Sequence, residues 1–370
     1  MKIKDDFLIY IFVFICVFCL FFNTFFGSKK TTLAQDNSSF IVYDPSLKTV
    51  ISGENIHSEM EPASTTKIVT LIVALQNIDD LERYVNISNK AEGVEGSSIF
   101  LKAGQQWKII DLLYGMMLRS GNDAATQIAL TTCGSVENFV DKMNALSLSL
   151  GLKNTSFKNP TGLPCVGHFT SAYDLAVLTA YGYEKYPLFS EIVSCKYHKT
   201  SPVKDGETET VFTFKNKNKL LFSFDGACGV KTGYTKRAGR CFVGCTKRQN
   251  LSLIYVCLNK YDMWEHCVSE TEKAFSSYQK IKLAEKGNTA GYVFCDETKE
   301  YIPLYFQSDL VLYLKEFNMD KLSYVIEKSQ SESKNDKNFQ YIRGNLKVYY
   351  DNGLIFICPL CNNINKYYKE

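Results

Sequence analysis

Ser64 and Lys67 are the first residues whose types and spacing could do chemistry. They stand in the stretch Glu61-Pro62-Ala63-Ser64-Thr65-Thr66-Lys67, ahead of the apolar run 68–75. A proline before helix-compatible residues marks a helix start, so the two side chains are expected one turn apart on one face. A serine hydroxyl needs a base to become nucleophilic, and a lysine can serve where burial or a second cation lowers its pKa. The backbone N–H of Ser64 could also hold a developing oxyanion.

A Ser-x-x-Lys pair alone does not establish a nucleophile. The same spacing occurs at Ser201/Lys204, Ser277/Lys280 and Ser331/Lys334, which have the character of ordinary polar surface or loop. Only Ser64 has the proline entry and an apolar helix behind it. The other parts of an active site must therefore come from elsewhere in the chain.

A second polar triplet, Ser120-Gly121-Asn122, lies between two expected helices, 109–118 and 124–131. On a turn between buried helices, short polar side chains can project into a cleft. Ser, Gly and Asn are also the residues expected at a helix C-cap followed by an N-cap. The triplet on its own leaves both interpretations open.

The third triplet, Lys231-Thr232-Gly233, precedes two alternating segments, 240–246 and 251–258, that are expected to form strands. It therefore starts an antiparallel meander. A glycine at 233 lets a substrate backbone lie against the strand, and Thr232 can hydrogen-bond a carboxylate. Lys231 would attract that carboxylate and keep Lys67 neutral.

In this order, the motifs Ser-x-x-Lys, Ser-x-Asn and Lys-Thr-Gly form the signature of penicillin-binding proteins and serine β-lactamases. We call them the three triplets below. The chain resembles the low-molecular-weight penicillin-binding proteins that act as D-alanyl-D-alanine carboxypeptidases, over about residues 38 to 280. The resemblance implies an α+β fold of the β-lactamase/transpeptidase type, with an antiparallel sheet flanked by helices and a helical lobe. It rests on the segments 62–67, 118–124, 159–163 with His168, and 229–235 with Ala238-Gly239.

The resemblance also implies a role for each motif residue. Ser64 would attack the penultimate D-alanine carbonyl to form an acyl-enzyme, with Lys67 as base and Ser120 relaying a proton to the leaving D-alanine. The implied substrate-binding residues are Asn122 for the amide, Lys231 and Thr232 for the terminal carboxylate, Gly233 along the strand, and Tyr234, whose backbone N–H joins that of Ser64 in the oxyanion hole. No metal or organic cofactor is expected. A lone histidine in a loop, His168 is more typical of a structural residue than of a catalytic one.

One position departs from the family pattern. Such carboxypeptidases often place an arginine after the last core strand to help bind the substrate carboxylate, whereas the corresponding stretch 264–269 has none. Arg240, nine residues past Lys231, is our candidate substitute.

Two alternative functions share some of these features. A class A β-lactamase has the three motifs but needs a glutamate after Ser-x-Asn to activate the deacylating water. From Asn138 to Tyr183 the chain contains no glutamate, which favours a carboxypeptidase that is inhibited by penicillin. A catalytically inactive wall-binding or penicillin-sensing module is the other alternative, and the intact motifs argue against it.

Length and composition predict an exported protein of two globular domains. The chain has 370 residues, 45% of them hydrophobic, and a net charge of +3. Its lysines are scattered and form no basic stripe, so no nucleic acid is expected as a partner. The expected partners are a peptidoglycan stem peptide ending in D-Ala-D-Ala and, as covalent inhibitors, β-lactams.

The N-terminal residues 1–34 are expected to be a signal peptide or a membrane anchor. The core from Phe7 to Phe22 is solidly apolar and about long enough to span a bilayer. Thr32-Leu33-Ala34 offers a small-residue cleavage site, so a cleaved and an uncleaved segment both remain open. The expected location is outside the cytoplasm, at the membrane or in the cell wall.

Behind this segment we expect a penicillin-binding carboxypeptidase domain, residues 35–280, and a small β-rich domain, residues 286–370. The second domain is indicated by short strand patterns and by Asp351-Asn352-Gly353, a favourable hairpin turn. The chain has 13 cysteines without the regular spacing of a disulfide scaffold, and most are expected to be small buried side chains. The single pair Cys358/Cys361 is not expected to bind zinc.

Overall fold

The computed structural model describes residues 37–295, 299–328 and 343–362. The expected signal peptide or anchor lies outside these residues, as does most of the polar loop expected at 328–338. Within the described part of the chain, no helix has the length and apolar character needed to cross a membrane.

A five-stranded antiparallel sheet forms the centre of the N-terminal part, in the order β2-β1-β11-β10-β9. β9 is an edge strand and carries the Lys231-Thr232-Gly233 triplet, and it pairs with β10 so that Gly233 faces Cys241. The meander expected from the sequence is confirmed. The five strands are β1 (Ser39–Asp44), β2 (Thr49–Glu54), β9 (Ala227–Thr235), β10 (Gly239–Arg248) and β11 (Leu251–Leu258).

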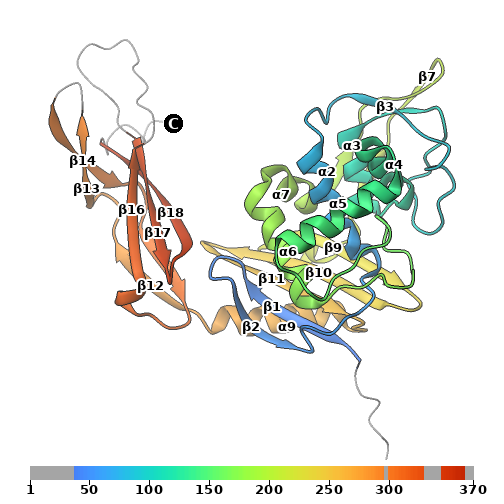
Figure 1. Ribbon diagram of the computed structural model, residues 1–370. Helices are drawn as coiled ribbons and strands as arrows, with labels where there is room; N and C mark the ends of the chain where they lie inside the picture. Colours follow the sequence, from blue (N-terminus) through green and yellow to red (C-terminus); the bar gives the residue numbers. More distant parts are fainter. Residues whose placement is uncertain (1–36, 296–298, 329–342, 363–370) are drawn as a thin grey trace, which may run out of the picture. The chain divides into compact units, whose positions relative to one another are not determined.

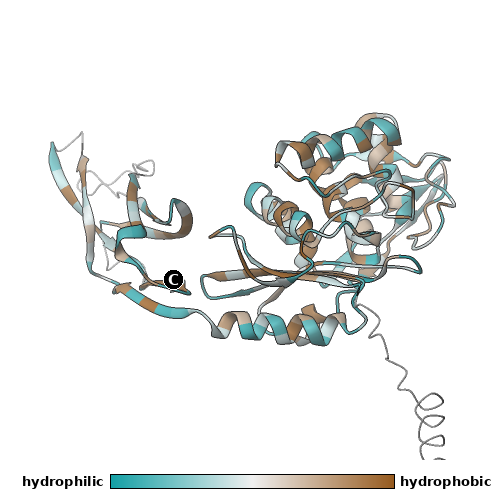
Figure 2. Ribbon diagram, turned by 60° about the horizontal axis from the view of Figure 1, so that its bottom comes forward, coloured by the Kyte–Doolittle hydropathy of each residue, from teal (hydrophilic) through white to brown (hydrophobic). Residues whose placement is uncertain are grey.

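Both faces of this sheet are covered, because its strands alternate apolar residues to either side. In β11, Ile254, Val256 and Leu258 pack into the core under the helical lobe, whereas Tyr255 and Cys257 pack on the opposite face. Figure 1 shows helices α2 to α7 on one side of the sheet and α9 (Met263–Ser276) on the other. In Figure 2, α9 alternates between hydrophilic and hydrophobic residues, as expected for a helix with one solvent face.

The helical lobe is built around α2 (Lys67–Asn77), whose residues from Lys67 to Ala74 are all buried. A helix that is apolar on every side belongs in the interior of a domain. The other helices of the lobe surround it: α3 (Ile109–Arg119), α4 (Asn122–Cys133), α5 (Val136–Ser149), α6 (Ala172–Lys185) and α7 (Pro187–Ser194).

The helix expected after Pro62 begins differently from the prediction. Its first turn is a 3₁₀ helix, η1 (Ala63–Thr66), and α2 follows directly from Lys67. Ser64 and Lys67 still face the same way, because residues three apart in a 3₁₀ turn lie above one another.

Three further element predictions need correction. The apolar segment from Leu220 to Phe224 follows a turn rich in Asn and Lys, and its sequence predicts a strand. It forms instead a short helix, α8 (Leu220–Ser223), in which Leu220 N donates to Asn218 Oδ1 at 3.1 Å. The sequence after the last strand of the meander predicts a helix from about Asp262 to Lys280, but this helix ends at Ser276, before a strand that begins at Gln279. For the helix expected from Ser171 to about Tyr183, the sequence suggests Thr170 as the N-cap. The N-cap of α6 is Ser171, whose side chain accepts from Asp174 N.

Two small sheets lie beside the helical lobe, and a separate β-rich domain follows α9. The small sheets consist of β3 (Tyr84–Asn86), β4 (Gln106–Lys108), β6 (Val203–Asp205) and β7 (Thr208–Thr210), and of β5 (Tyr197–Lys199) with β8 (Thr213–Lys215). The C-terminal strands form the pair β12-β15 and the sheet β13-β14-β18-β17-β16. Their bounds are β12 (Gln279–Ala284), β13 (Thr289–Cys295), β14 (Glu300–Phe306), β15 (Leu310–Leu314), β16 (Leu322–Lys328), β17 (Arg343–Tyr350) and β18 (Gly353–Cys361), with a 3₁₀ turn η2 (Met319–Lys321).

The hairpin turn predicted in the C-terminal domain is present between β17 and β18. Asp351 and Asn352 both have positive φ, 51° and 65°, as a two-residue type I′ turn requires. Ten of the cysteines in the described part of the chain are outside any disulfide bond. Six of them are buried, in agreement with their expected role as small apolar side chains: Cys241, Cys245, Cys257, Cys267, Cys358 and Cys361.

Candidate active site

The amine of Lys67 lies 3.1 Å from the hydroxyl of Ser64. Lys67 is fully buried, and its Nζ also donates to Asn122 Oδ1 and to the carbonyl of Thr161, both at 2.6 Å. These two acceptors come from α4 and from the long loop before α6. Together with the segment η1–α2, which carries both residues, α4 and this loop position Lys67 against Ser64.

Burial lowers the pKa of Lys67 to about 7, and the positive charge of Lys217 contributes to the lowering. The negative charge of Asp123 acts in the opposite direction and raises this pKa. A lysine whose pKa lies near neutrality can take a proton from a hydroxyl at physiological pH. The pair can therefore work as a nucleophile and its general base.

The Ser120-Gly121-Asn122 triplet joins α3 to α4, as expected. Ser120 is the C-cap of α3 in the left-handed conformation, with φ 65°, and Asn122 is already the first residue of α4. The Asn122 side chain donates from Nδ2 to Glu95 O at 2.6 Å, so its Oδ1 is turned toward Lys67. The triplet serves as helix caps and also supplies polar groups to the site.

His168 holds the loop before α6 against η1, the turn that carries Ser64. Its Nδ1 accepts from Lys158 N, so the proton is on Nε2, which lies 3.0 Å from Thr66 Oγ1. Burial, followed by the charge of Lys158, lowers the pKa of His168 to about 4. A buried neutral imidazole with both nitrogens engaged is a structural element, as the sequence analysis favoured.

Strand β9 approaches the turn that carries Ser64 very closely. A Cβ built on Gly233 would lie 3.0 Å from the backbone nitrogen of Ser64 and 3.1 Å from the carbonyl oxygen of Pro62. Any side chain at this position would push the strand away from η1. The glycine of the third triplet is therefore required by the contact between two parts of the protein, and not only by a substrate.

Lys231 is buried, with 2% of its surface exposed, and its Nζ donates to Thr232 O at 2.8 Å. Burial lowers its pKa well below the usual value, and the charges of Lys67 and Lys217 add to this effect. Within this site, a positive charge on one of these amines makes protonation of its neighbours less favourable.

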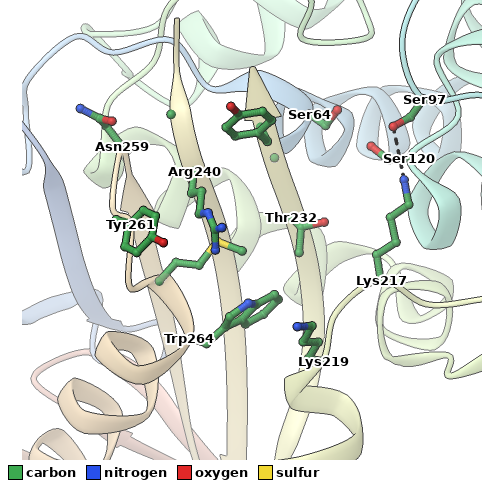
Figure 3. A pocket seen from close by; sticks show the side chains of 14 residues that line it. Ser64, Ser97, Ser120, Lys217, Lys219, Thr232, Arg240, Asn259, Tyr261 and Trp264 are labelled. Atoms are coloured by element: carbon green, nitrogen blue, oxygen red, sulfur yellow. Dashed lines mark hydrogen bonds between the residues drawn. The ribbon is translucent and has the colours of Figure 1, made fainter. Parts of the chain in front are cut away.

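A pocket of about 670 Å³ extends from Ser64 across the edge of β9 (Figure 3). The residues from all three triplets that reach it are Ser64, Ser120, Thr232 and Gly233, and Tyr234 lines it as well. Farther along, the lining is cationic and aromatic and contains no acidic residue: Lys217, Lys219, Arg240, Tyr261 and Trp264.

Arg240 lies in this pocket with its guanidinium carbon 4.8 Å from the centre of the Tyr261 ring. Figure 3 shows it on β10, beside the strand that carries Thr232. The structure therefore brings this sequence-predicted residue to the same cavity as Ser64.

Lys217 is a functional candidate that the sequence analysis missed. Its Nζ lies 3.3 Å from Ser97 Oγ, at the side of the pocket that holds Ser120 (Figure 3). The sequence signal that could have revealed it is the alternation of lysine and asparagine over residues 215–219. In the structure the lysines of this segment are exposed, and Asn216 and Asn218 are buried. Asn218 Nδ2 donates to Gly229 O at 2.8 Å, which fixes this segment beside β9.

A comparison with protein families identifies the fold and the site together. The family described as D-alanyl-D-alanine carboxypeptidase, peptidase S11, matches residues 27–262. This range is more than half of the chain and contains all three triplets. The chain belongs to the peptidase S11 family. Its enzyme class is accordingly that of a hydrolase, a D-alanyl-D-alanine carboxypeptidase.

Similar proteins agree with this assignment. The D-alanyl-D-alanine carboxypeptidase DacF of Bacillus subtilis is 33% identical over 284 residues, which cover 74% of this chain and 71% of DacF. Among solved structures, the Streptomyces K15 DD-transpeptidase aligns with a TM-score of 0.59 at 27% identity, covering 64% of this chain and 94% of that one.

The C-terminal domain also has a counterpart. Penicillin-binding protein 5 from Haemophilus influenzae aligns with a TM-score of 0.60 at 26% identity and covers 87% of this chain and 95% of its own. Since the family match ends at residue 262, this larger coverage includes much of the β-rich domain. The predicted fold class, with a catalytic domain followed by a β-rich domain, is confirmed.

Proposed function

We propose that this protein removes the terminal D-alanine from peptidoglycan stem peptides ending in D-Ala-D-Ala, through an acyl-enzyme on Ser64. The observation that carries the proposal is the 3.1 Å contact between Ser64 Oγ and the buried amine of Lys67. With its pKa lowered to about 7, Lys67 is partly neutral at physiological pH and can accept the serine proton.

The reaction proceeds in two steps. Lys67 takes the proton of Ser64, whose oxygen attacks the penultimate carbonyl, and the backbone amides of Ser64 and Tyr234 hold the oxyanion. The C–N bond breaks, and Ser120 passes a proton to the leaving amine of D-alanine. Water then attacks the ester, so that the shortened peptide leaves and Ser64 regains its proton. Neither step needs a metal or a cofactor.

The substrate is held along β9, with its terminal carboxylate toward Thr232. The cations of the pocket are suited to this anion, because Arg240 and Lys219 line the cavity and have no acidic neighbour among the lining residues. Lys231 belongs to the same strand, and its buried amine donates to the Thr232 carbonyl. Asn122 binds the substrate amide and orients Lys67.

Penicillin should be a covalent inhibitor of this site and not a substrate. A class A β-lactamase needs a glutamate after Ser-x-Asn to activate the deacylating water, and residues 138–183 contain none. The penicilloyl ester on Ser64 is therefore expected to persist. The inactive-module alternative is disfavoured by the assembled Ser64–Lys67 pair. The place of action follows from the substrate and lies outside the cytoplasm, in the cell wall.

Release of D-alanine from a peptide ending in D-Ala-D-Ala tests the proposal. The wild-type protein and a Ser64→Ala variant are compared, with Ser201→Ala as the matched control from another Ser-x-x-Lys pair. We expect release by the wild type and by Ser201→Ala, and none by Ser64→Ala. Absence of release from the folded wild-type protein would exclude the proposal and support the binding-module alternative.

A further inference from the structure

A buried carboxylate that the mechanism does not use lies next to Asn122. Asp123 is 1% exposed, in the first turn of α4. Its oxygens accept from Ser98 Oγ at 2.5 Å, Ile99 N at 3.0 Å and Leu101 N at 3.1 Å. Among the described residues, no lysine, arginine or histidine forms an ion pair with it. A carboxylate buried in this way is stabilised by the donors that it gathers and by the helix N-terminus.

Segment 95–101, which donates to Asp123 through residues 98, 99 and 101, also holds Asn122 in place. Ser97 O accepts from Asn122 N at 2.7 Å, and Glu95 O accepts from Asn122 Nδ2 at 2.6 Å. Because a carbonyl can only accept, the second bond decides which end of the Asn122 amide faces Lys67. The same segment presents Ser97 Oγ to Lys217 at 3.3 Å.

We infer that Asp123 is a positioning residue for the acylation step, holding segment 95–101 so that this segment fixes the Asn122 amide against Lys67 and places Ser97 beside Lys217. This inference rests on the proposed function of Ser64 and Lys67. It assigns to the residue after the Ser-Gly-Asn triplet a task distinct from capping a helix, since most of its partners lie outside α4.

Asp123 has an electrostatic effect as well. The charged groups that face Lys67 are Lys217 from the segment before α8, Lys231 from β9 and Asp123 from α4. Asp123 is the only anion of the three, and it raises the pKa of Lys67 against the lowering by burial and by Lys217. Removal of its charge lowers that pKa. The acid limb of the pH–rate profile, where the acylation rate rises with pH, therefore moves to lower pH. A residue that only stabilised the fold would not move this limb.

The rate of acylation by benzylpenicillin, measured between pH 5 and 9, tests the inference in the full protein. Asp123→Asn keeps the size but removes the charge, and turns an amide donor toward the donors of segment 95–101. We expect acylation at least about tenfold slower than in the wild type, with the acid limb shifted to lower pH. An Asp123→Asn variant with the wild-type rate and limb would overturn the inference, as would slower acylation with an unmoved limb.

Two further variants separate positioning from general stability. Ser98→Ala removes one hydroxyl from the carboxylate and no charge, so acylation should slow about fivefold with the limb unmoved. If Asp123→Asn does not fold, Ser98→Ala decides, and a wild-type rate in that variant would overturn the inference.

Asp174→Asn is the matched control. Asp174 is buried in the first turn of α6 and accepts from Asn154 N and Thr155 Oγ1. We expect this variant to lose thermal stability but to keep the wild-type acylation rate and limb. A wild-type protein that is not acylated at all would overturn the proposed function and this inference with it. Normal acylation of the wild type with an unaffected Asp123→Asn overturns the inference alone.

Discussion

Gly233 lies directly against the backbone of Ser64: a Cβ built on it would be 3.0 Å from Ser64 N. The edge strand β9 and the turn η1 can approach each other this closely only because position 233 has no side chain. The proposed oxyanion site depends on this approach, since one of its two amides belongs to η1 and the other to β9.

Gly233→Ala should therefore reduce acylation far more than it reduces stability. Displacement of one oxyanion donor costs on the order of 10²-fold in rate. The acylation rate with benzylpenicillin measures the effect. Gly206→Ala is the control, because its added Cβ meets nothing within 4 Å, although its φ of +61° is unfavourable for alanine. Equal acylation rates in the two variants would contradict the proposed contact.

The pH dependence of acylation should follow Lys67. The pKa of Lys67 is lowered to about 7, and the neutral amine is the active form in the proposed mechanism. Activity should thus rise with pH through about 7 and reach a plateau above it, with protonation switching the base off below. We expect this acid limb in kcat/KM for the peptide and in the rate of β-lactam acylation. A rate that is flat between pH 5.5 and 8 would exclude Lys67 as the base.

Lys217 should tune this limb. Its positive charge contributes to lowering the pKa of Lys67, so Lys217→Met should raise that pKa and shift the acid limb to higher pH. Lys215→Met is the matched control, since Lys215 is exposed two residues away, over the rings of Tyr197 and Phe222. Coincident limbs in the two variants would show that Lys217 does not act on the base.

Arg240→Ala should weaken substrate binding through the terminal carboxylate. A charge-assisted hydrogen bond of about 1.5 kcal/mol corresponds to roughly a tenfold higher KM for a D-Ala-D-Ala peptide. Arg248→Ala is the control, because Arg248 pairs with Glu272. If the KM values of the wild type and Arg240→Ala agree, the carboxylate is bound by other residues.

His168 should make the fold sensitive to acid. Its pKa is about 4 in the folded protein against 6.5 as the ordinary value, so the unfolded chain binds the proton more readily. The stabilisation is complete above pH 6.5 and is lost as the pH falls toward 4, by as much as about 3 kcal/mol. Urea unfolding at several pH values should show a smaller pH dependence in His168→Gln. An unchanged dependence would contradict this role.

The sequence was sufficient to predict the parts of the site that lie close together along the chain or carry a family motif. Ser64 and Lys67 are three residues apart, so local helix geometry brings them together whatever the rest of the fold does. The meander that carries Lys231 was visible in the alternation of its strands. The order of the three triplets then pointed to the family.

Contacts between distant segments could not be predicted in the same way. How loops cross the helical lobe decides two of these contacts: the hydrogen bond from Lys67 to Thr161 O, and the hydrogen bonds from residues 98–101 to Asp123. The low exposure of Lys231 was missed because a lysine in a strand is normally taken to be exposed. The segment 220–224, expected to be a strand, forms α8, and the Asn218 side chain accepts from the backbone N–H of Leu220 at its start, a local hydrogen bond that hydrophobic pattern alone does not reveal.

The most direct test of the account is to identify the residue that benzylpenicillin acylates. Intact-mass measurement after brief exposure, followed by peptide mapping, should find one adduct of the whole opened β-lactam, on Ser64, with parallel loss of D-alanine release. The adduct should persist, because the loop before α6 offers no glutamate to hydrolyse it. An adduct on another residue, or rapid turnover of penicillin without a lasting adduct, would contradict the proposed mechanism.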